Sequence, residues 1–173
     1  MDLEELIARA EITDVLHRYC RAVDRRDPEL LRSVYHSDAT DDHGVYAGPV
    51  DGLVAFMLGD GLEMIHHAIS NIVIERDGDV ARVECYLDAV HRRVDDTGSW
   101  DEMLKARYLD RFERRGGEWR VAARTVIYDW IEERTRPELK QDDTALFGAR
   151  QPVGTAAPHD AVYALLRAVR GDG

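Results

Sequence analysis

The sequence predicts an α+β fold in which amphipathic N-terminal helices cover one face of a strongly curved, mostly antiparallel sheet. Two observations carry this prediction. Up to Tyr35, apolar residues recur every three or four positions, which is the period of a helix. From His66 onward, four long segments rich in β-branched and aromatic residues follow one another. Helices first and a meander of strands last is the order of helices laid on one side of an antiparallel sheet.

The composition fits one domain that binds neither nucleic acid nor membranes. The chain has 173 residues, of which 45% are apolar, and this is enough for one hydrophobic core. Its 34 acidic and 23 basic residues leave a formal net charge of -11, which repels phosphate backbones and anionic lipids. The acidic first residues are unlike a signal peptide. We therefore expect a soluble, cytoplasmic protein, with Cys20 and Cys85 packed as small apolar side chains.

The first helix is expected to end at a corner that carries Asp24. An apolar stripe of helical period ends at Val23. Asp27 followed by Pro28 is an N-cap with proline at the first helical position, so a second short helix begins there. In a regular helix Asp24 would lie about 120° from the stripe and face solvent. Its carboxylate turns toward the sheet only if the helix ends or tightens at Val23.

The elements after this corner are predicted in order. Turn-forming residues surround a short strand from Ala39 to His43, and a small helix follows within residues 52–62. Hairpin turns are expected at Asp77-Gly78 and Gly116-Gly117. The four long strands are expected at residues 66–75, 79–93, 100–115 and 118–133. We expect one domain over residues 1–134 and an arm over residues 135–173, whose short terminal helix packs on the domain or on a partner subunit.

Two features predict a homo-oligomer, a dimer or a trimer. A second apolar stripe, from Leu3 to Ala10, points almost opposite to the first, so the helix is either interrupted near Glu11 or packs its first turns against another surface. The last strand is apolar at both odd and even positions, and a strand buried on both faces needs cover on both. The helices would cover one face, and a second subunit or the C-terminal tail would cover the other.

Four polar side chains interrupt apolar stretches: Asp24, His67, Asp88 and Arg124. Burying a polar group without a partner costs about 1 to 3 kcal/mol, so such residues usually have a reason to be there. Each also has a structural interpretation. Asp24 can be a solvated charge, and His67 a hydrogen-bonded residue at a strand start. Arg124 can pair with Asp88 across neighbouring strands as a structural ion pair.

Cofactor and metal signatures are missing from the sequence. No Gly-x-Gly-x-x-Gly, P-loop or Gly-x-Ser-x-Gly motif occurs. The run Asp41-Asp42-His43 and the pair His66-His67 lack the spacing of helical or thiolate metal sites, and a turn loop explains the two aspartates. We expect no metal and no organic cofactor.

The motifs together carry a family resemblance. In order, "RYCRAVDRRDPELLRSVY", "SDAT", "YAGPVDGLVAF", "HHAISNIVIE" and "GEWRVAARTVIY" resemble the SnoaL-like branch of the nuclear transport factor 2-like (NTF2-like) superfamily over roughly residues 5–134. Within that branch the chain looks most like the group of scytalone dehydratase, bile-acid 7α-dehydratase and hexachlorocyclohexane dehydrochlorinase. The resemblance implies a cone-shaped α+β barrel around an apolar pocket that the helices close.

The resemblance also implies a site. Asp24 and His67 match the catalytic dyad of that group, and four further residues match polar groups that bind substrate: Tyr19, His43, Asp88 and Arg124. The expected function is a cofactor-independent lyase, a dehydratase or related elimination enzyme, for a small hydrophobic cyclic substrate. The pocket lining is expected from Val15, Leu16, Leu58, Ile69, Val126 and Tyr128. A steroid or polyketide isomerase or cyclase of the same fold, or a non-catalytic ligand-binding or assembly subunit, is the alternative.

Overall fold

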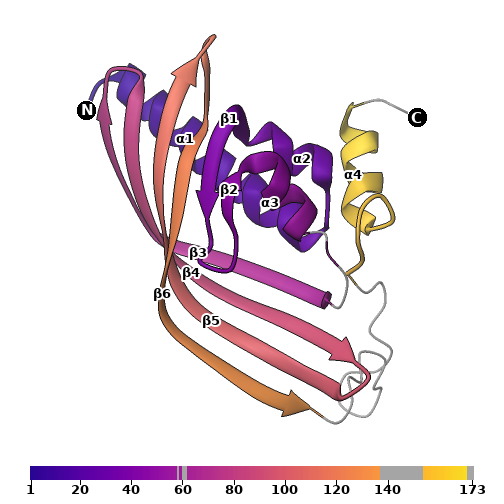
Figure 1. Cartoon of the computed structure of the whole chain (residues 1–173). Helices are drawn as coiled ribbons and strands as arrows, with labels where there is room; N and C mark the ends of the chain where they lie inside the picture. Colours follow the sequence, from indigo (N-terminus) through magenta and orange to yellow (C-terminus); the bar gives the residue numbers. More distant parts are fainter. Residues whose placement is uncertain (58, 60–61, 137–153, 171–173) are drawn as a thin grey trace.

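The chain runs through helices and two short strands before four long strands and a terminal helix (Figure 1). This computed structural model describes residues 1–57, 59, 62–136 and 154–170. The described elements are α1 (Leu3–Asp24), α2 (Pro28–Ser33), β1 (Tyr35–Asp42), β2 (Ala47–Pro49), α3 (Val50–Met57), β3 (Leu62–Asp77), β4 (Val80–Asp95), β5 (Gly98–Arg115), β6 (Glu118–Arg136) and α4 (Ala161–Arg170). The predicted helices and the four long strands are all present, and β2 is an additional short strand.

The six strands form one sheet in the order β2-β1-β6-β5-β4-β3. Only β1 and β6 pair in parallel, and the other neighbours are antiparallel. The long strands bend near their middle, and α1, α2 and α3 lie inside the bend (Figure 1). The predicted α+β class, with N-terminal helices packed on a strongly curved sheet, is confirmed.

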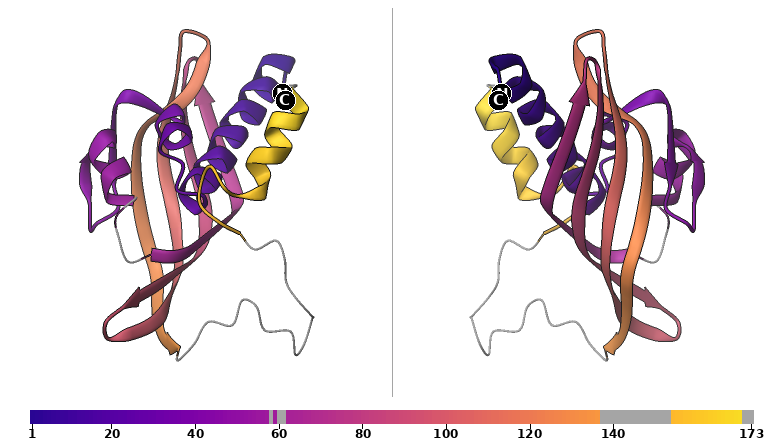
Figure 2. Two further views of the ribbon diagram at one scale, coloured as in Figure 1. Left: turned by 90° about the vertical axis from the view of Figure 1, so that its right-hand side faces the viewer. Right: turned by 90° about the vertical axis from the view of Figure 1, so that its left-hand side faces the viewer.

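Helix α1 supplies most of the helical side of the core. Its N-cap Asp2 accepts a hydrogen bond from the Glu5 backbone N–H at 2.9 Å. The helix is continuous, so of the two alternatives for its first turns the interruption near Glu11 is excluded, and it runs obliquely across the sheet (Figure 2). The stripe through Val15 and Tyr19 is buried, whereas the side chains of the first turns are exposed. No described helix is both long and apolar enough to cross a bilayer.

The corner after α1 has the hydrogen bonds of a Schellman motif. The Asp27 N–H donates to the Ala22 carbonyl at 2.8 Å, and the Arg26 N–H donates to the Val23 carbonyl at 3.1 Å. Arg26 takes the left-handed conformation, with φ of 49°. Asp27 caps α2 by accepting from the Leu30 N–H at 3.0 Å. The first helix therefore ends at Asp24, not before it, and its last side chain faces the sheet.

The alternation of side chains along β6 shifts at two extra residues, which corrects the expectation that the strand is buried on both faces within this chain. Against β5, Arg111 pairs with Ala123 while Phe112 pairs with Val121, so Ala122 is an extra residue in the strand. A second register shift lies at Asp129. A bulge moves the following side chains to the opposite face. Apolar residues at both odd and even positions therefore record the bulges, not a sheet covered on both sides.

The described C-terminal segment, residues 154–170, contacts the corner between α1 and α2 (Figure 1). The Ala157 N–H donates to the Arg25 carbonyl at 2.6 Å, and the Tyr163 hydroxyl donates to Asp27 Oδ2 at 2.7 Å. Asp160 lies 3.6 Å from the Arg25 Nε. Residues 137–153 and 171–173 of the expected arm lie outside the described residues, so its division from the domain stays a prediction.

Replacing Arg26 by glycine is expected to stabilise the protein. A left-handed conformation is strained for a residue with a Cβ atom and unstrained for glycine. Arg26→Gly should raise the free energy of unfolding in urea by about 0.5 to 1 kcal/mol. Arg25→Gly is the matched control: Arg25 has φ of -99°, so glycine there should lower stability. Equal losses in both variants would contradict this account of the corner.

Candidate active site

The last residue of α1 and the inner face of β3 meet in a buried carboxylate–imidazole contact. Asp24 Oδ1 lies 2.7 Å from His67 Nδ1, and Asp24 Oδ2 accepts from the His67 backbone N–H at 3.2 Å. The two side chains are 10% and 3% exposed, respectively. An ionised carboxylate only accepts hydrogen bonds, so the neutral ring carries its proton on Nδ1. The structure therefore brings the two predicted dyad residues together and leaves Nε2 without a partner among the described residues.

Strand alternation aims His67 inward. Ile65 and His67 are buried on the face that meets the helices, whereas His66 between them is exposed. A register shift between Ser70 and Val73 follows, where Asn71 has φ of 51°. The inward direction of His67 thus comes from the strand, and that of Asp24 from the end of the helix.

Burial sets the protonation state of His67. Removal from water lowers the pKa of His67 from its ordinary value of 6.5, and the hydrogen bond to Asp24 partly offsets this by favouring the charged ring. The positive charges that His91 and His43 carry when protonated lower the pKa further. His67 is therefore neutral near pH 7 and has a free Nε2 lone pair.

His91 on β4 is a neighbour of the dyad that sequence reasoning missed. It pairs with Ile65 across the β3–β4 ladder, and its ring centroid lies 5.4 Å from that of His67. Its Nδ1 lies 3.7 Å from Glu102 Oε2. Its Nε2 is buried and has no hydrogen-bond partner among the described residues. In the sequence His91 opens the run "HRR", which looks like a solvated strand end, and only its register against Ile65 reveals it.

A second carboxylate–imidazole pair lies on β1. His43 Nδ1 contacts Asp41 Oδ1, and His43 Nε2 lies 3.3 Å from the Tyr19 hydroxyl. The Tyr35 hydroxyl donates to Asp41 Oδ2 at 2.6 Å. The Tyr128 hydroxyl donates to the His43 carbonyl at 3.0 Å. Asp41 is a buried residue of β1, which agrees with the short strand predicted there, whereas the turn-loop explanation of Asp41 is wrong.

Arg124 is buried and pairs with Asp110, not with Asp88. Its guanidinium makes two hydrogen bonds of 2.7 Å to Asp110, and both side chains are fully buried. The guanidinium lies 4.0 Å from the Tyr19 ring centroid and 3.9 Å from that of Tyr108. The structural alternative for Arg124 named Asp88 as its partner, and this is wrong: β5 lies between β4 and β6, so Arg124 faces Asp110 across the β5–β6 ladder.

Asp88 lies on the opposite face of the sheet from the dyad. Its neighbours Leu87 and Ala89 are buried on the inner face. The Asp88 side chain is half exposed and pairs with Lys105 on β5. The structure therefore does not bring Asp88 to the dyad, whereas Tyr19 and His43 lie inside the fold.

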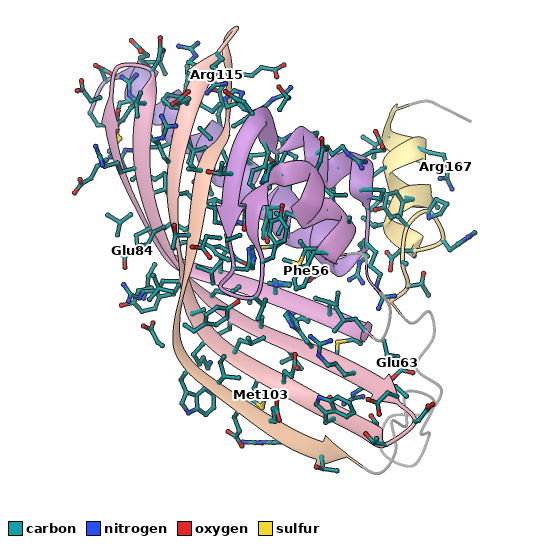
Figure 3. The ribbon with its side chains drawn as sticks, viewed as in Figure 1. Phe56, Glu63, Glu84, Met103, Arg115 and Arg167 are labelled. Carbon is teal, nitrogen blue, oxygen red and sulfur yellow. The ribbon has the colours of Figure 1, made fainter. Side chains whose placement is uncertain are left out.

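The expected apolar lining is only partly placed next to the dyad. Val15 and Leu16 are fully buried in the core, Ile69 shares the inner face of β3 with His67, and Leu58 lies outside the described residues. A groove of about 460 Å³ lies elsewhere and contains neither dyad residue. Its lining includes Glu84, which points away from the helices (Figure 3). Among the described residues, no three His, Cys, Asp or Glu side chains form a group that could hold a metal ion.

Comparisons with known proteins agree with the fold. A family model described as a SnoaL-like domain matches residues 4–125. No curated protein sequence matches the chain. A solved hexachlorocyclohexane dehydrochlorinase has 21% identity and a TM-score of 0.72, and the match covers 80% of this chain and 97% of that one. A candidate scytalone dehydratase from Novosphingobium aromaticivorans has 19% identity and a TM-score of 0.68, with the same coverages.

A third solved structure, a candidate aromatic ring hydroxylase from a Novosphingobium aromaticivorans strain, has 20% identity and a TM-score of 0.65. The match covers 74% of this chain and 92% of that one. All three identities are too low to transfer an activity, so these likenesses show the shared fold.

The Asp110–Arg124 and Asp88–Lys105 ion pairs should contribute very different amounts to the free energy of unfolding. Asp110→Ala leaves the Arg124 charge buried without its partner, so it should lower the free energy of unfolding by about 3 to 5 kcal/mol. Asp88→Ala removes a half-exposed pair with Lys105 and should cost at most about 1 kcal/mol. Urea unfolding of both variants measures the difference. Similar losses would show that Arg124 does not depend on Asp110.

His67 is expected to titrate below pH 6.5, and Asp24→Ala should lower its pKa further, because the carboxylate favours the charged ring. NMR titration of the imidazole, assigned with His67→Gln, measures both values. The unfolded chain binds this proton more tightly than the folded one, so stability is complete above pH 6.5 and falls as the pH drops below it. A wild-type midpoint at or above 6.5 would contradict the burial argument.

Proposed function

Because the chain belongs to the SnoaL-like domain family, we propose that it is a cofactor-independent lyase, a dehydratase or related elimination enzyme, for a small hydrophobic cyclic substrate. The observation that supports this most is the buried contact between His67 Nδ1 and Asp24 at 2.7 Å. A protein that only binds ligands or assembles with others has no need of an imidazole whose second nitrogen is kept neutral and unpaired.

His67 is the proposed general base. Elimination begins with removal of a proton from a carbon next to an activating group, and a base works best when its lone pair is free at the working pH. The Nε2 atom of His67 is such a base, because the ring is neutral near pH 7 and Nε2 has no partner among the described residues. Asp24 holds the ring orientation and stabilises the imidazolium that forms, as a carboxylate does behind a catalytic histidine. We assign the two residues the roles of base and orienting group.

The departing hydroxyl or halide needs a proton donor. His91 supplies it in this proposal, because its ring lies beside that of His67 and its Nε2 is unpaired among the described residues. Glu102 Oε2 lies 3.7 Å from His91 Nδ1 and orients the ring. Asp88 and Arg124 are not assigned this role, because Asp88 lies on the outer face and the guanidinium of Arg124 is fully buried and paired through Nε and Nη2 with Asp110.

Isomerisation is the second candidate, because the same dyad supports it. A histidine that removes a proton from one carbon can return it to another, which moves a double bond without loss of a group. The two reactions differ in their products: elimination releases water or halide, and isomerisation releases nothing.

Loss of either dyad residue should remove activity without unfolding the protein. A panel of hydroxylated cyclic ketones, followed by the ultraviolet absorbance of the new conjugation, identifies a substrate. On it, His67→Gln and Asp24→Asn should each lower kcat by about 10²- to 10⁴-fold, the range attributed to general base catalysis. His66→Gln is the matched control: its side chain is exposed on the other face of β3, so turnover should not change. Wild-type turnover in either dyad variant would remove that residue from the mechanism.

A further inference from the structure

Beyond the dyad, the inner face of the sheet continues toward the β4–β5 turn. Leu87 and Ala89 are buried on this face, and side chains two positions apart on a strand share a face. The strand ladders therefore carry two further rows of inner-face residues past Ala89. The rows are His91, Glu102 and Glu133, and then Arg93, Trp100 and Thr135.

A hollow of about 300 Å³ opens on the β5–β6 part of these two rows. Its lining consists of Trp100, Glu133 and Thr135 together with residues 97–99 at the start of β5. It lies at the end of the sheet that extends past helices α1, α2 and α3 (Figure 1). Neither dyad residue lines it.

The hollow is too far from the dyad to be filled by a small substrate bound there. His67 pairs with Ala89, and Ala89 pairs with Leu104 on β5. Trp100 follows four positions away from Leu104 along the same strand, which is about 14 Å. The hollow is therefore a separate place for a ligand.

One negative charge in the hollow has no counterpart. Glu102 and Glu133 lie directly opposite each other across the β5–β6 ladder, and like charges in this position are destabilising. Arg93 compensates Glu102, because its Nε donates to Glu102 Oε1 at 2.6 Å. Glu133 has no hydrogen bond or ion pair with any residue that the structure describes. A cation that enters the hollow relieves this repulsion.

Trp100 makes the hollow suitable for an organic cation. Its indole is half-buried and has no ring contact or cation–π contact with another described residue. The face of an indole attracts ammonium groups, and most strongly when they are alkylated and weakly hydrated. The net charge of -11 also draws cations toward the protein and repels anions.

We propose that the Trp100–Glu133 hollow, formed by Trp100, Glu133, Thr135 and residues 97–99, binds an organic ammonium group. The indole ring packs on the cation, and the Glu133 carboxylate neutralises its charge. The ligand class is a small alkylammonium or trimethylammonium compound. The proposal does not rest on the proposed function, because the hollow contains no dyad residue.

Three probes of nearly one shape test the proposal without any turnover. Choline carries a trimethylammonium group, 3,3-dimethylbutan-1-ol replaces it with a neutral tert-butyl group, and 3,3-dimethylbutanoate is an anion. NMR titration of the full chain at low ionic strength, followed at the backbone amides of residues 97–99, measures each affinity.

Choline should bind about fivefold tighter than the neutral alcohol, the effect of one cation–π contact at a partly exposed site. The anion should bind more weakly than both. Equal affinities for choline and the alcohol, or no binding of choline, would overturn the proposal. Tightest binding of the anion would also overturn it and assign the hollow to Arg93.

Variants locate the preference for the cation. Trp100→Leu and Glu133→Gln should each reduce it to about twofold or less. Glu132→Gln is the matched control for Glu133, since Glu132 is the adjacent residue and pairs with Arg134. Trp130→Leu is the control for Trp100, because Trp130 is exposed and lies outside the hollow. Both controls should keep the wild-type preference, and an unchanged preference in the Trp100 or Glu133 variant would overturn the assignment.

Urea unfolding without any ligand checks the charge argument independently. Glu133→Gln removes one of two opposed like charges, so it should raise the urea midpoint. A lower midpoint would show that Glu133 is already satisfied in the free protein and would overturn the proposal. The comparison of the three probes uses the unmodified chain, so it decides the question even where a variant fails to fold.

Discussion

The contact between Asp24 and His67 is the constraint around which the helical layer is arranged. A carboxylate in the interior is tolerated only when its oxygens are satisfied, and here both accept hydrogen bonds from one residue of β3. This requires α1 to end within reach of the strand. The Schellman turn and the capped start of α2 provide that end. The site is therefore a consequence of where one helix stops.

The interior of the fold is polar to an unusual degree, and its polar groups are satisfied in linked pairs. Asp110 neutralises Arg124, and Asp41 receives both His43 and Tyr35. Burying such charges is costly, and their mutual attraction in a medium of low dielectric constant offsets much of that cost. Aromatic rings around Arg124 exclude water from the cluster. The few polar atoms left without a partner among the described residues then stand out as sites for a ligand.

The sequence was sufficient for the order of elements, because local signals determine it. The pairing of Asp24 with His67 was expected only from the family resemblance, since the helical period alone turned Asp24 toward solvent. Pro28 after Asp27 predicted the start of α2, and the alternation of side chains along β3 puts His67 and His66 on opposite faces of the sheet. The partners of Arg124 and Asp88 could not be predicted, because both pair with residues of β5, Asp110 and Lys105, and these pairings depend on strand order and register. His91 was not predicted for the same reason, because only its pairing with Ile65 across the β3–β4 ladder places it beside His67. Strand register depends on pairing between distant segments, which periodicity along one segment does not contain.

During translation, the tertiary contacts of this chain can form only in a particular order. Tyr163 bonds to Asp27 across a separation of 136 residues, and β1 pairs with β6, the last strand to be made. While the ribosome is still translating the sheet, β1 lacks its neighbour β6, and the corner after α1 lacks its C-terminal contact. Asp24 can meet His67 as soon as β3 is made, whereas β1 and the corner must wait for the end of the chain, so nascent chains must keep this edge unaggregated until β6 is made.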